Sequence, residues 1–497
     1  MKLSKTNYLI YRGCGKNAWV RIHRPDIFKK YPLSAFEEGI IETGNEVDIL
    51  ARQLFPGGVF VEDRYDFEYT KKLVEEKNLV IYQPVFETEK YQIACDIVVW
   101  NKDTEKYDLY EVKASNSGED KKKKDELYTQ DIAFQYIVLK DSGVPIGKLY
   151  LTRLNVEYVR NGDLNINEFF TKEDFTERVL ENEDLVREEM QMAYDYLFQE
   201  DEPAGHCDCI TKGRNGHCTT FEYSNPDVPK YSVHDISRIG LSKRKLEELI
   251  DSGIYDILDV PEDMKLSDKQ LNQIEVARSR EDIIEREEIQ SFLDTIEYPI
   301  AFFDYETFPS AIPRFDGYSP YNQIPFQFSV HVLDKPKGEL THEEFIYTGE
   351  GNPDVPVIEA LQKLIPGKGS VIVWYKSFEM SRNKELGKRN PAFETFLSSL
   401  NDRIIDLEDP FKDQFYVHPE FKGKTSIKYI LPALVPELSY KELDIQEGGT
   451  ASNTWNRIVT GEYSEEEAGR QIKNLLKYCE LDTFAMVEIF KFLQRVV

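Results

Sequence analysis

The chain has few cysteines and no long apolar run, and each shortage excludes a class of protein. Only 6 of its 497 residues are cysteine, too few for a disulfide scaffold, so cysteines that gather in a reducing compartment are better explained as metal ligands. No stretch approaches the ~20 consecutive apolar residues of a transmembrane helix. Residues 1–16 also lack the apolar core of a signal peptide. We therefore expect a cytoplasmic protein with no membrane partner.

Positive charge is also scarce, and this bears on nucleic-acid binding. The chain has 62 Lys and Arg against 90 Asp and Glu, a net charge of −28. This argues against a coat protein that binds nucleic acid through a general basic surface. It leaves room for an enzyme with a local basic groove, which Lys121 to Lys124 and the lysines around Lys424 can supply. A hydrophobic content of 41% provides for folded cores.

Hydrophobic periodicity predicts an α/β chain in three parts. Residues 1–220 and 295–497 each mix helical and strand patterns, so each is expected to fold around a sheet. Residues 221–294 have the pattern of short helices, with an outline that resembles a helix-hairpin-helix element. The expected strands are 79–86, 91–100, 107–114, 147–154, 299–305, 326–332 and 371–375. The expected helices are 37–54, 125–139, 171–202, 241–254, 266–277, 384–400 and 465–494.

The first group of chemical interest lies in neighbouring strands of the N-terminal part. Asp96 interrupts an apolar run, where a buried carboxylate is costly unless it is paired or bound to a metal. Strand alternation puts Glu111 and Lys113 on one face of the following strand. Two carboxylates and an ammonium group that converge can hold a divalent metal and orient the water that it activates.

This pattern, an acid followed by Glu-x-Lys in the next strand, resembles the PD-(D/E)xK nuclease motif in its RecB-like branch. That branch carries a metal-supporting residue on its first helix and a glutamine on the helix after the motif. The resemblance implies a restriction-endonuclease-like core with a Mg or Mn site; an ordinary salt-bridged strand pair is the alternative. The residues it assigns are Asp96 and Glu111 as metal ligands and catalytic acids, Lys113 and Gln135 as catalytic residues, and either Glu46 or Asp48 as the further metal-supporting acid.

Four cysteines in two places form the second group. They are Cys14, near the start of the chain, and Cys207, Cys209 and Cys218, which follow the N-terminal core. RecB-like nucleases of the CRISPR-associated and AddB types close their fold with a four-cysteine iron–sulfur cluster, one ligand before the core and three after it, and the placement here is similar. The resemblance implies a 4Fe-4S cluster. The alternatives are a zinc site that includes His206 or His217, and no metal at all.

The third group belongs to the C-terminal part. Asp304 and Glu306 lie two apart on a strongly apolar strand, hence on one face, where their mutual repulsion is costly without a cation between them. Near the end of the chain, Tyr478 and Asp482 are four apart on one helical face. They can offer a water-orienting hydroxyl and a metal ligand. Hard carboxylate oxygens suit Mg or Mn better than zinc.

This third group resembles the DEDD exonuclease superfamily of the RNase H-like (DnaQ-like) fold, in its tyrosine-bearing subtype. The middle motif is carried by Glu379, where the superfamily has Asp, and Asp406 is a reserve candidate. The resemblance implies two metal ions and in-line attack of an activated water on a terminal phosphodiester; an inert scaffold of this fold is the alternative. The residues it assigns are Asp304, Glu306, Glu379 and Asp482 as metal ligands, with Tyr478 as a catalytic residue.

Over nearly its whole length the chain resembles an uncharacterised prokaryotic family in which a RecB-like nuclease region precedes domain of unknown function 2779. Residues 421–432 share in that likeness, and Lys422, Lys424 and Lys428 within them are candidates for phosphate contact. These patterns predict a metal-dependent nuclease with two centres that hydrolyses DNA ends or single strands in repair or defence, beside a helicase or another such protein. The alternatives are a nucleic-acid-binding adaptor with decayed centres, and an exonuclease that acts on RNA.

Overall fold

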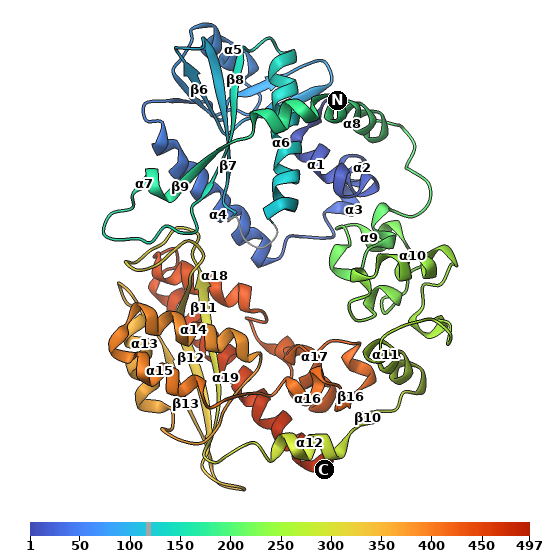
Figure 1. Ribbon diagram of the computed structural model, residues 1–497, viewed down its shortest axis with the longest axis vertical. Helices are drawn as coiled ribbons and strands as arrows, with labels where there is room; N and C mark the ends of the chain where they lie inside the picture. Colours follow the sequence, from blue (N-terminus) through green and yellow to red (C-terminus); the bar gives the residue numbers. More distant parts are fainter. Residues whose placement is uncertain (116–120) are drawn as a thin grey trace. The chain divides into compact units, whose positions relative to one another are not determined.

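The computed structural model describes residues 1–115 and 121–497, which divide into two compact units (Figure 1). Unit 1 consists of residues 1–211, 215–227 and 311–321, and unit 2 of residues 212–214, 228–310 and 322–497. The predicted helical part therefore does not form a unit of its own, because from residue 228 onward it belongs to unit 2. Across the described ranges, no helix combines the length and the apolar character needed to cross a bilayer.

Unit 1 is built around a mixed sheet of six strands, accompanied by a smaller sheet of three. Its strands are β1 (Leu3–Ser4), β2 (Val59–Phe60), β3 (Val80–Tyr82), β4 (Val85–Glu87), β5 (Tyr91–Ala94), β6 (Ile97–Asn101), β7 (Lys106–Lys113), β8 (Ile146–Leu154) and β9 (Phe170–Asp174). The large sheet has the order β2-β3-β6-β7-β8-β9, and the small one β1-β5-β4. Strands β6 and β7 are antiparallel neighbours, whereas β7 and β8 are parallel.

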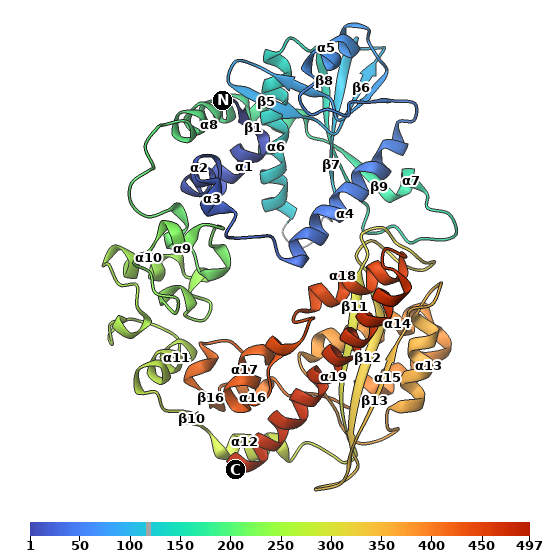
Figure 2. The same cartoon turned by 180° about the vertical axis from the view of Figure 1, so that it is seen from behind.

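The helices of unit 1 pack around this sheet. They are α1 (Lys5–Gly13), α2 (Gly15–His23), α3 (Pro25–Phe28), α4 (Ala35–Ala51), α5 (Phe67–Glu75), α6 (Lys121–Asp141), α7 (Ile166–Phe169), α8 (Thr176–Leu197) and α9 (Phe221–Ser224). Helix α6 lies between the sheet and α1 and α8 (Figures 1 and 2), and Ile132, Phe134 and Val138 on it are fully buried in the core. Parallel strands need such a crossover helix, so α6 connects β7 to β8.

Two predicted strands, 79–86 and 91–100, are each broken in the middle. Gln83 has a left-handed φ of 52°, and the proline after it cannot donate a hydrogen bond. The backbone N–H of Gln83 donates to the carbonyl of Asp96 at 2.9 Å, so the two breaks lie side by side. Beyond the breaks, β4 and β5 leave the large sheet and join β1. Asp96 therefore lies between β5 and β6, and its side chain turns toward β7.

Other predicted boundaries also shift in unit 1 and unit 2. The start of the expected acidic helix 171–202 forms the edge strand β9, and α8 begins only at Thr176. The expected helix 384–400 consists of two helices, because Pro391 stands between them. Residues 311–321, which follow the first strand of the C-terminal sheet, belong to unit 1. There the Tyr321 hydroxyl donates a hydrogen bond to the carbonyl of Ala114.

Unit 2 contains a five-stranded sheet and a short two-stranded one. Its strands are β10 (Ile283–Ile284), β11 (Ile300–Pro309), β12 (Gln323–Leu333), β13 (Leu340–Ile346), β14 (Val371–Val373), β15 (Ile404–Asp406) and β16 (Tyr416–Val417). The large sheet has the order β13-β12-β11-β14-β15. The β11–β12 and β12–β13 pairs are antiparallel, whereas the β11–β14 and β14–β15 pairs are parallel.

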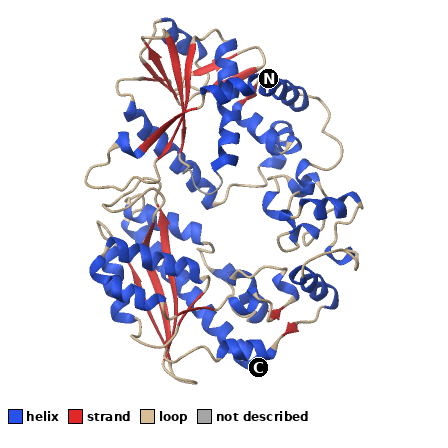
Figure 3. Cartoon of the chain, in the orientation of Figure 1, coloured by secondary structure: helices blue, strands red, loops and turns tan. Residues whose placement is uncertain are grey.

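Helices cover both faces of this sheet (Figures 2 and 3). The helices of unit 2 are α10 (Lys243–Asp251), α11 (Asp268–Ser279), α12 (Arg286–Leu293), α13 (Asp354–Leu364), α14 (Lys376–Arg389), α15 (Glu394–Asn401), α16 (Asp409–Lys412), α17 (Ile427–Leu434), α18 (Gly448–Val459) and α19 (Glu465–Val496). Helices α13, α14 and α15 cover one face, and α18 and α19 the other. Where a helix-hairpin-helix outline was expected, α10 and α11 are joined through a separate 3-10 turn, Ile257–Asp259.

Alternation along β11 decides which residues meet α19. Ala301, Phe303 and Tyr305 belong to the apolar core that includes residues of α13, α14 and α15, whereas Phe302 packs against Phe490 of α19. Because alternate side chains point to opposite faces, Asp304 lies on the α19 side together with Phe302. The same alternation puts Glu306 on this side, so both carboxylates lie between the sheet and α19, its longest helix.

Candidate functional site

Four acidic side chains converge beside α19 in unit 2. Asp304 and Glu306 come from β11, Glu379 from the first turn of α14, and Asp482 from α19. Glu306, Glu379 and Asp482 are 7%, 1% and 8% exposed. Asp304, Glu379 and Asp482 each raise the pKa of at least one other acid of the group, and all three raise that of Glu306, which places the negative charges within electrostatic reach of one another. The structure thus brings together all four acids that the sequence suggested for this centre.

Burial is the main reason why these acids hold protons tightly. It raises the pKa of Asp304 well above its usual range, and the Asp482 carboxylate raises it further. Burial and the neighbouring Asp304 have the same effect on the pKa of Glu306 and of Glu379. For Asp482, burial raises the pKa to about 7, against the lowering effect of the Tyr440 hydroxyl. Without a cation, the group favours partial protonation.

Two cations act on the acids from outside the group. Lys428 of α17 lowers the pKa of Glu306 and of Asp482, but its ammonium group donates its hydrogen bond to the carbonyl of Gln446 at 2.7 Å. Arg382 lowers the pKa of Glu379 and forms an ion pair with Glu385, also on α14. Neither cation therefore neutralises the group by direct contact.

Glu379 is held in place by the start of helix α14. Tyr375, just before the helix, has a left-handed φ of 74°, and the Asp406 carboxylate accepts the N–H groups of Tyr375 and Lys376 at 2.9 Å each. Asp406, the reserve candidate, thus caps the helix and positions Glu379 without joining the acids. The Oε2 atom of Glu379 is buried and has no hydrogen-bond partner among the described residues, and this leaves it available to a ligand.

Tyrosine side chains line the group next to Asp482. The Tyr440 hydroxyl donates a hydrogen bond to Asp482 Oδ1 at 2.6 Å. Tyr478 lies one turn before Asp482 on α19, is 4% exposed, and has its pKa raised by burial and by the Asp482 carboxylate. The ammonium group of Lys428 lies over both rings, 5.6 and 5.5 Å from their centroids. Tyr440 was missed from the sequence because it lies in a short 3-10 turn, Tyr440–Glu442, without any periodic pattern.

Cys479 also faces this group. It is fully buried. Its sulfur lies 3.8 Å from the carbonyl oxygen of Asp304. Ligand atoms of Asp304, Glu306 and Cys479 lie within 4.8 Å of one another, close enough for a single ion to reach all three.

The acids of unit 1 are paired with lysines. Glu111 of β7 is 1% exposed and accepts hydrogen bonds from Lys5 Nζ at 2.9 Å, Lys113 Nζ at 2.5 Å and Gln135 Nε2 at 2.7 Å. Burial by itself would raise the pKa of Glu111, but the two ammonium groups outweigh it and hold the pKa well below its usual range. Lys113 also donates to Asp131 at 2.7 Å. The result is a closed cluster of charges around one carboxylate.

Asp96 lies beside this cluster. Its Oδ2 accepts the N–H of Val112, the residue after Glu111, at 2.7 Å. Burial and the Glu111 carboxylate raise the pKa of Asp96 to about 7, although Lys5 lowers it. The Gln83 amide donates to Asp96 at 3.4 Å and to Asp48 at 3.2 Å. The structure thus brings Asp96 next to Glu111, as the motif implies.

The two acids left open on α4 are distinguished by their surroundings. Asp48 shares Gln83 with Asp96 and pairs with Arg52 at 2.5 Å. Glu46 is exposed, and it interacts with Arg314 of the segment 311–321. Asp48 is therefore the acid that the structure places beside Asp96.

Two members of the unit 1 cluster were missed from the sequence. Lys5 comes from the first helix, far from the motif. Asp131 precedes Gln135 by four residues on α6, and the Gln135 amide donates to it at 2.9 Å. Lys5 is half-buried, whereas Asp131 and Gln135 are buried. The spacing of Asp131 and Gln135, four residues apart and hence on one face of α6, is the signal that could have identified Asp131.

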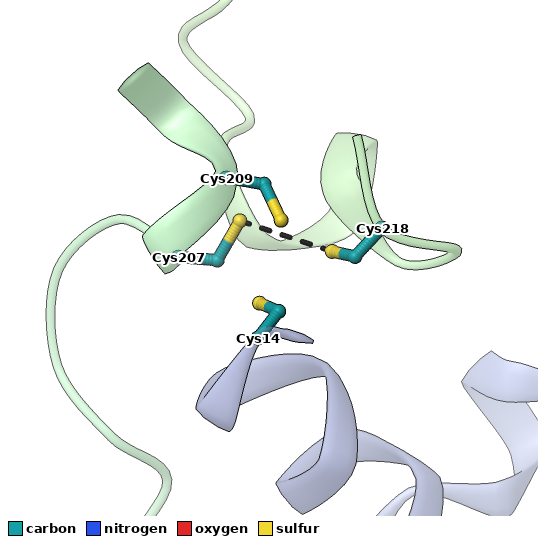
Figure 4. Close-up of side chains that lie close together, drawn as sticks. All are labelled: Cys14, Cys207, Cys209 and Cys218. Atoms are coloured by element: carbon teal, nitrogen blue, oxygen red, sulfur yellow. Dashed lines mark hydrogen bonds between the residues drawn. The ribbon is translucent and has the colours of Figure 1, made fainter. Parts of the chain in front are cut away.

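The four cysteines meet in unit 1, as Figure 4 shows. Cys14 stands between α1 and α2; Cys207 directly precedes the 3-10 turn Asp208–Thr211, Cys209 lies within it and Cys218 follows it. All four sulfur atoms lie within 4.8 Å of one another, with 3.9 Å between Cys207 and Cys218. The Cys14 sulfur is the main cause that lowers the pKa of the Cys207 thiol and raises that of Cys218, and the Cys207 sulfur is the main cause that raises the pKa of Cys14.

These distances test which metal fits the cysteines. A zinc–sulfur bond of about 2.3 Å places tetrahedral sulfurs about 3.8 Å apart, which agrees with the separation of Cys207 and Cys218. A 4Fe-4S cluster stands between its thiolates and needs them farther apart. Neither histidine of the alternative zinc site completes the group: His206 contacts Asp227 at 3.0 Å, and His217 stacks on Phe221.

The lysines expected to contact phosphates have partners within the chain. Lys424 donates to the Tyr429 hydroxyl at 2.7 Å and lies over its ring. Lys422 lies over the ring of Tyr231. Of the run at the start of α6, Lys121 pairs with Glu173 at 3.8 Å. Of the lysines in residues 421–432, Lys428 is the one that acts on the acidic group.

Comparison with known proteins assigns part of unit 2. Residues 301–426 match a family described as Domain of unknown function (DUF2779), a range that contains Asp304, Glu306 and Glu379 but ends before α19. The chain is 26% identical over 301 residues to "Uncharacterized protein UU173" of Ureaplasma parvum, which covers 56% of this chain and 41% of that protein.

Two further relatives come from mycoplasmas. The chain is 27% identical to "Uncharacterized protein MG366 homolog" of Mycoplasma pneumoniae over 210 residues and to "Uncharacterized protein MG366" of Mycoplasma genitalium over 214 residues. Each match covers 39% of this chain and 32% of the relative. The chain thus spans less than half the length of the curated relatives it matches. No solved structure matches it.

Proposed function

We propose that unit 2 is a metal-dependent phosphodiester hydrolase that acts on nucleic acid, most readily as an exonuclease on DNA. The observation that carries this proposal is the set of four acids from β11, α14 and α19, three of them buried and Asp304 partly buried, with no ion pair to a cation among the described residues. Such a group favours a divalent metal because hard cations prefer carboxylate oxygens. The sheet that carries two of these acids has the order third-second-first-fourth-fifth along the chain, with an antiparallel first half and a parallel second half.

The residues of the centre have distinct parts in this chemistry. Bound Mg or Mn ions, held by Asp304, Glu306, Glu379 and Asp482, would supply an activated water and neutralise charge on the phosphate. Tyr478 presents a buried hydroxyl that can orient that water. Tyr440 keeps Asp482 in one orientation through its short hydrogen bond. Lys428, already near Glu306 and Asp482, can offset the charge that develops on a leaving oxygen.

Glu379 stands where the resemblance implies an aspartate. The extra methylene moves the carboxylate outward from its helix, and a misplacement of about an ångström is enough to alter a rate. Its partnerless Oε2 nevertheless lies in electrostatic reach of Asp304. We therefore include Glu379 among the metal ligands of the proposed enzyme.

Unit 1 supports a second nuclease centre of the PD-(D/E)xK type. Its specific support is Asp96, which accepts the N–H of Val112, the residue between Glu111 and Lys113, and whose pKa burial and the Glu111 carboxylate raise. To bind a metal here, Glu111 must exchange at least one lysine for the ion, which costs part of the binding energy. We expect this centre to bind Mn more weakly than unit 2. The cysteine site would close unit 1 with a single zinc ion.

A nuclease assay with matched variants tests the main proposal. Purified protein with Mn would be given linear and circular substrates, single- and double-stranded, of DNA and of RNA. We expect end-dependent degradation that Asp304→Asn and Asp482→Asn abolish and that Glu111→Gln spares. Degradation that survives both unit 2 substitutions would contradict the assignment. Metal-independent binding of nucleic acid without hydrolysis would instead support the adaptor.

The metal at the cysteines has its own test. Anaerobically purified protein with one zinc ion and no visible absorbance would agree with the sulfur spacing, whereas a brown protein with a shoulder near about 400 nm would indicate an iron–sulfur cluster. Cys207→Ser should remove whichever metal is found.

A further inference from the structure

A second set of metal-ligand side chains lies where strands β12 and β13 meet α19. It comprises His331 of β12, His342 of β13 and Glu480 of α19, whose ligand atoms lie within 4.8 Å of one another. The two histidines are directly opposite each other in the antiparallel pair, and their rings stack with centroids 4.4 Å apart. This group is separate from the four acids in its ligand set, although both use α19.

Hydrogen bonds orient each imidazole and leave one ring nitrogen of each outside them. His331 Nδ1 bonds to the Thr483 hydroxyl at 2.8 Å, and His342 Nε2 bonds to the Ser329 hydroxyl at 3.0 Å. The two hydroxyls are themselves 2.7 Å apart. The other nitrogen of His342, Nδ1, lies 3.8 Å from Glu480 Oε1. Metal-bound histidines typically use one nitrogen for the ion and fix the other through such a bond.

A buried carboxylate oxygen gives an independent sign that a cation belongs here. Glu344 lies two residues after His342, hence on the same face of β13, and its Oε2 is buried without a partner in the described part of the chain. Burial raises the pKa of Glu344, His342 lowers it and Glu480 raises it, so both of these side chains lie near Glu344. A buried, unpaired carboxylate oxygen is costly, and a metal ion would satisfy it.

We propose that His331, His342 and Glu480, with Glu344 as the fourth ligand, form a zinc site that fastens α19 to the β12–β13 edge of the sheet. Two imidazoles favour zinc over Mg, which the oxygen-only acid group prefers. Because Asp482 and Tyr478 flank Glu480 on α19, the ion would stabilise the position of the helix that carries them. The site does not depend on the proposed hydrolase, since its ligands are separate.

Co²⁺ as an optical probe and Zn²⁺ as the ligand test this site in the full chain. The protein is stripped of metal and titrated in excess Mg²⁺, which occupies the acid group; wild type is compared with His342→Gln and Glu480→Gln. Glu466→Gln, an exposed acid four turns earlier on α19, is the matched control. We expect each site variant to bind one ion fewer than wild type, or to bind that ion at least about tenfold more weakly. Zn²⁺ should raise the melting temperature of each site variant less than that of wild type, whereas Glu466→Gln should show the full rise.

The cysteine site is distinguished by its thiolate-to-cobalt absorption, which His342→Gln should leave intact. Equal stoichiometry, affinity and thermal shift in wild type and both site variants would overturn the proposal. Should His342→Gln fail to fold, the half-exposed Glu480 still provides the test, because its replacement leaves the buried packing unchanged. The nuclease assay with Mn²⁺ tests other residues. A negative nuclease assay therefore leaves the zinc proposal standing, and a negative zinc titration leaves the nuclease proposal standing.

Discussion

The two groups of acids in this protein are alike in composition and opposite in their electrostatics. In unit 1, the ammonium groups of Lys5 and Lys113 contact Glu111 directly and hold its pKa low. In unit 2, burial raises the pKa of Glu306, although it is a glutamate on a central strand as well. The comparison teaches that burial alone does not set the state of a carboxylate; the position of the nearest cation does.

This electrostatic difference predicts that the two acid groups differ in their need for a metal ion. The unit 1 cluster is neutralised by the chain itself, so it can exist without metal and serves the stability of its unit. The unit 2 group requires either protons or an added cation, and binding a metal there relieves a repulsion built into the fold. Four pairs of substitutions would break or sharpen this contrast.

The largest effect is expected from removing a cation in unit 1. Lys113→Met leaves two buried acids, Glu111 and Asp131, without one of their partners, and should destabilise unit 1 by about 3 kcal/mol. Lys428→Met in unit 2 removes a cation that makes no direct ion pair with the acids, and should cost less than about 1 kcal/mol. Thermal and denaturant unfolding of both variants without metal measures this, and equal losses would contradict the contrast.

Metal affinity, in contrast to stability, should depend mainly on the acids of unit 2. Glu306→Gln removes a ligand from the unit 2 group and should weaken Mn²⁺ binding by at least about 100-fold, roughly 2.7 kcal/mol. Glu111→Gln should leave that tighter binding step unchanged. Calorimetric titration at constant pH separates the two, and a decayed centre would show no such step in the wild type.

The stability of the metal-free protein should depend on pH through Asp482. Its pKa is raised from 3.8 to about 7 in the folded state, so the folded chain keeps a proton that the unfolded chain releases, and stability falls as pH rises from about 4 to about 7. Asp482→Asn removes this loss and should stabilise the metal-free protein at pH 8 by about 2 kcal/mol, with little gain at pH 4. Unfolding in the presence of a chelator at both pH values is the measurement; Asp406→Asn, outside the group, should not reproduce the gain.

The smallest effect is expected from Tyr440. Tyr440→Phe removes the hydrogen bond to Asp482 Oδ1, which stabilises the charged carboxylate by about 1 kcal/mol. The pKa of Asp482 should rise, and Mn²⁺ affinity near pH 7 should fall about fivefold, with the difference shrinking at higher pH. Tyr429→Phe, an exposed tyrosine of α17, serves as the control. An affinity unchanged by Tyr440→Phe at pH 7 would show that the bond does not tune the site.

The sequence identified candidate ligands where a residue type was unusual for its local surroundings. Acids such as Asp304 within an apolar strand, and cysteines as closely spaced as Cys207 and Cys209, contradict the usual composition of a core and so stand out without any structure. The strand breaks around Asp96 were not visible, because the apolar pattern continues through them and the left-handed Gln83 has no distinctive signal. The prediction of a single helix over 384–400 is wrong because Pro391 separates α14 from α15.

The sequence by itself therefore determined which acids and thiols are available and that several of them must be buried, because burial follows from short-range patterns of apolar residues. Only the tertiary structure decided which of those acids received a counter-charge. Lys5, Asp131, Tyr440 and the histidine pair reach their partners from distant segments, and contacts between distant segments leave no mark in the local pattern of a chain. The physical reason is that electrostatic pairing depends on distances in space, which the order of residues does not specify.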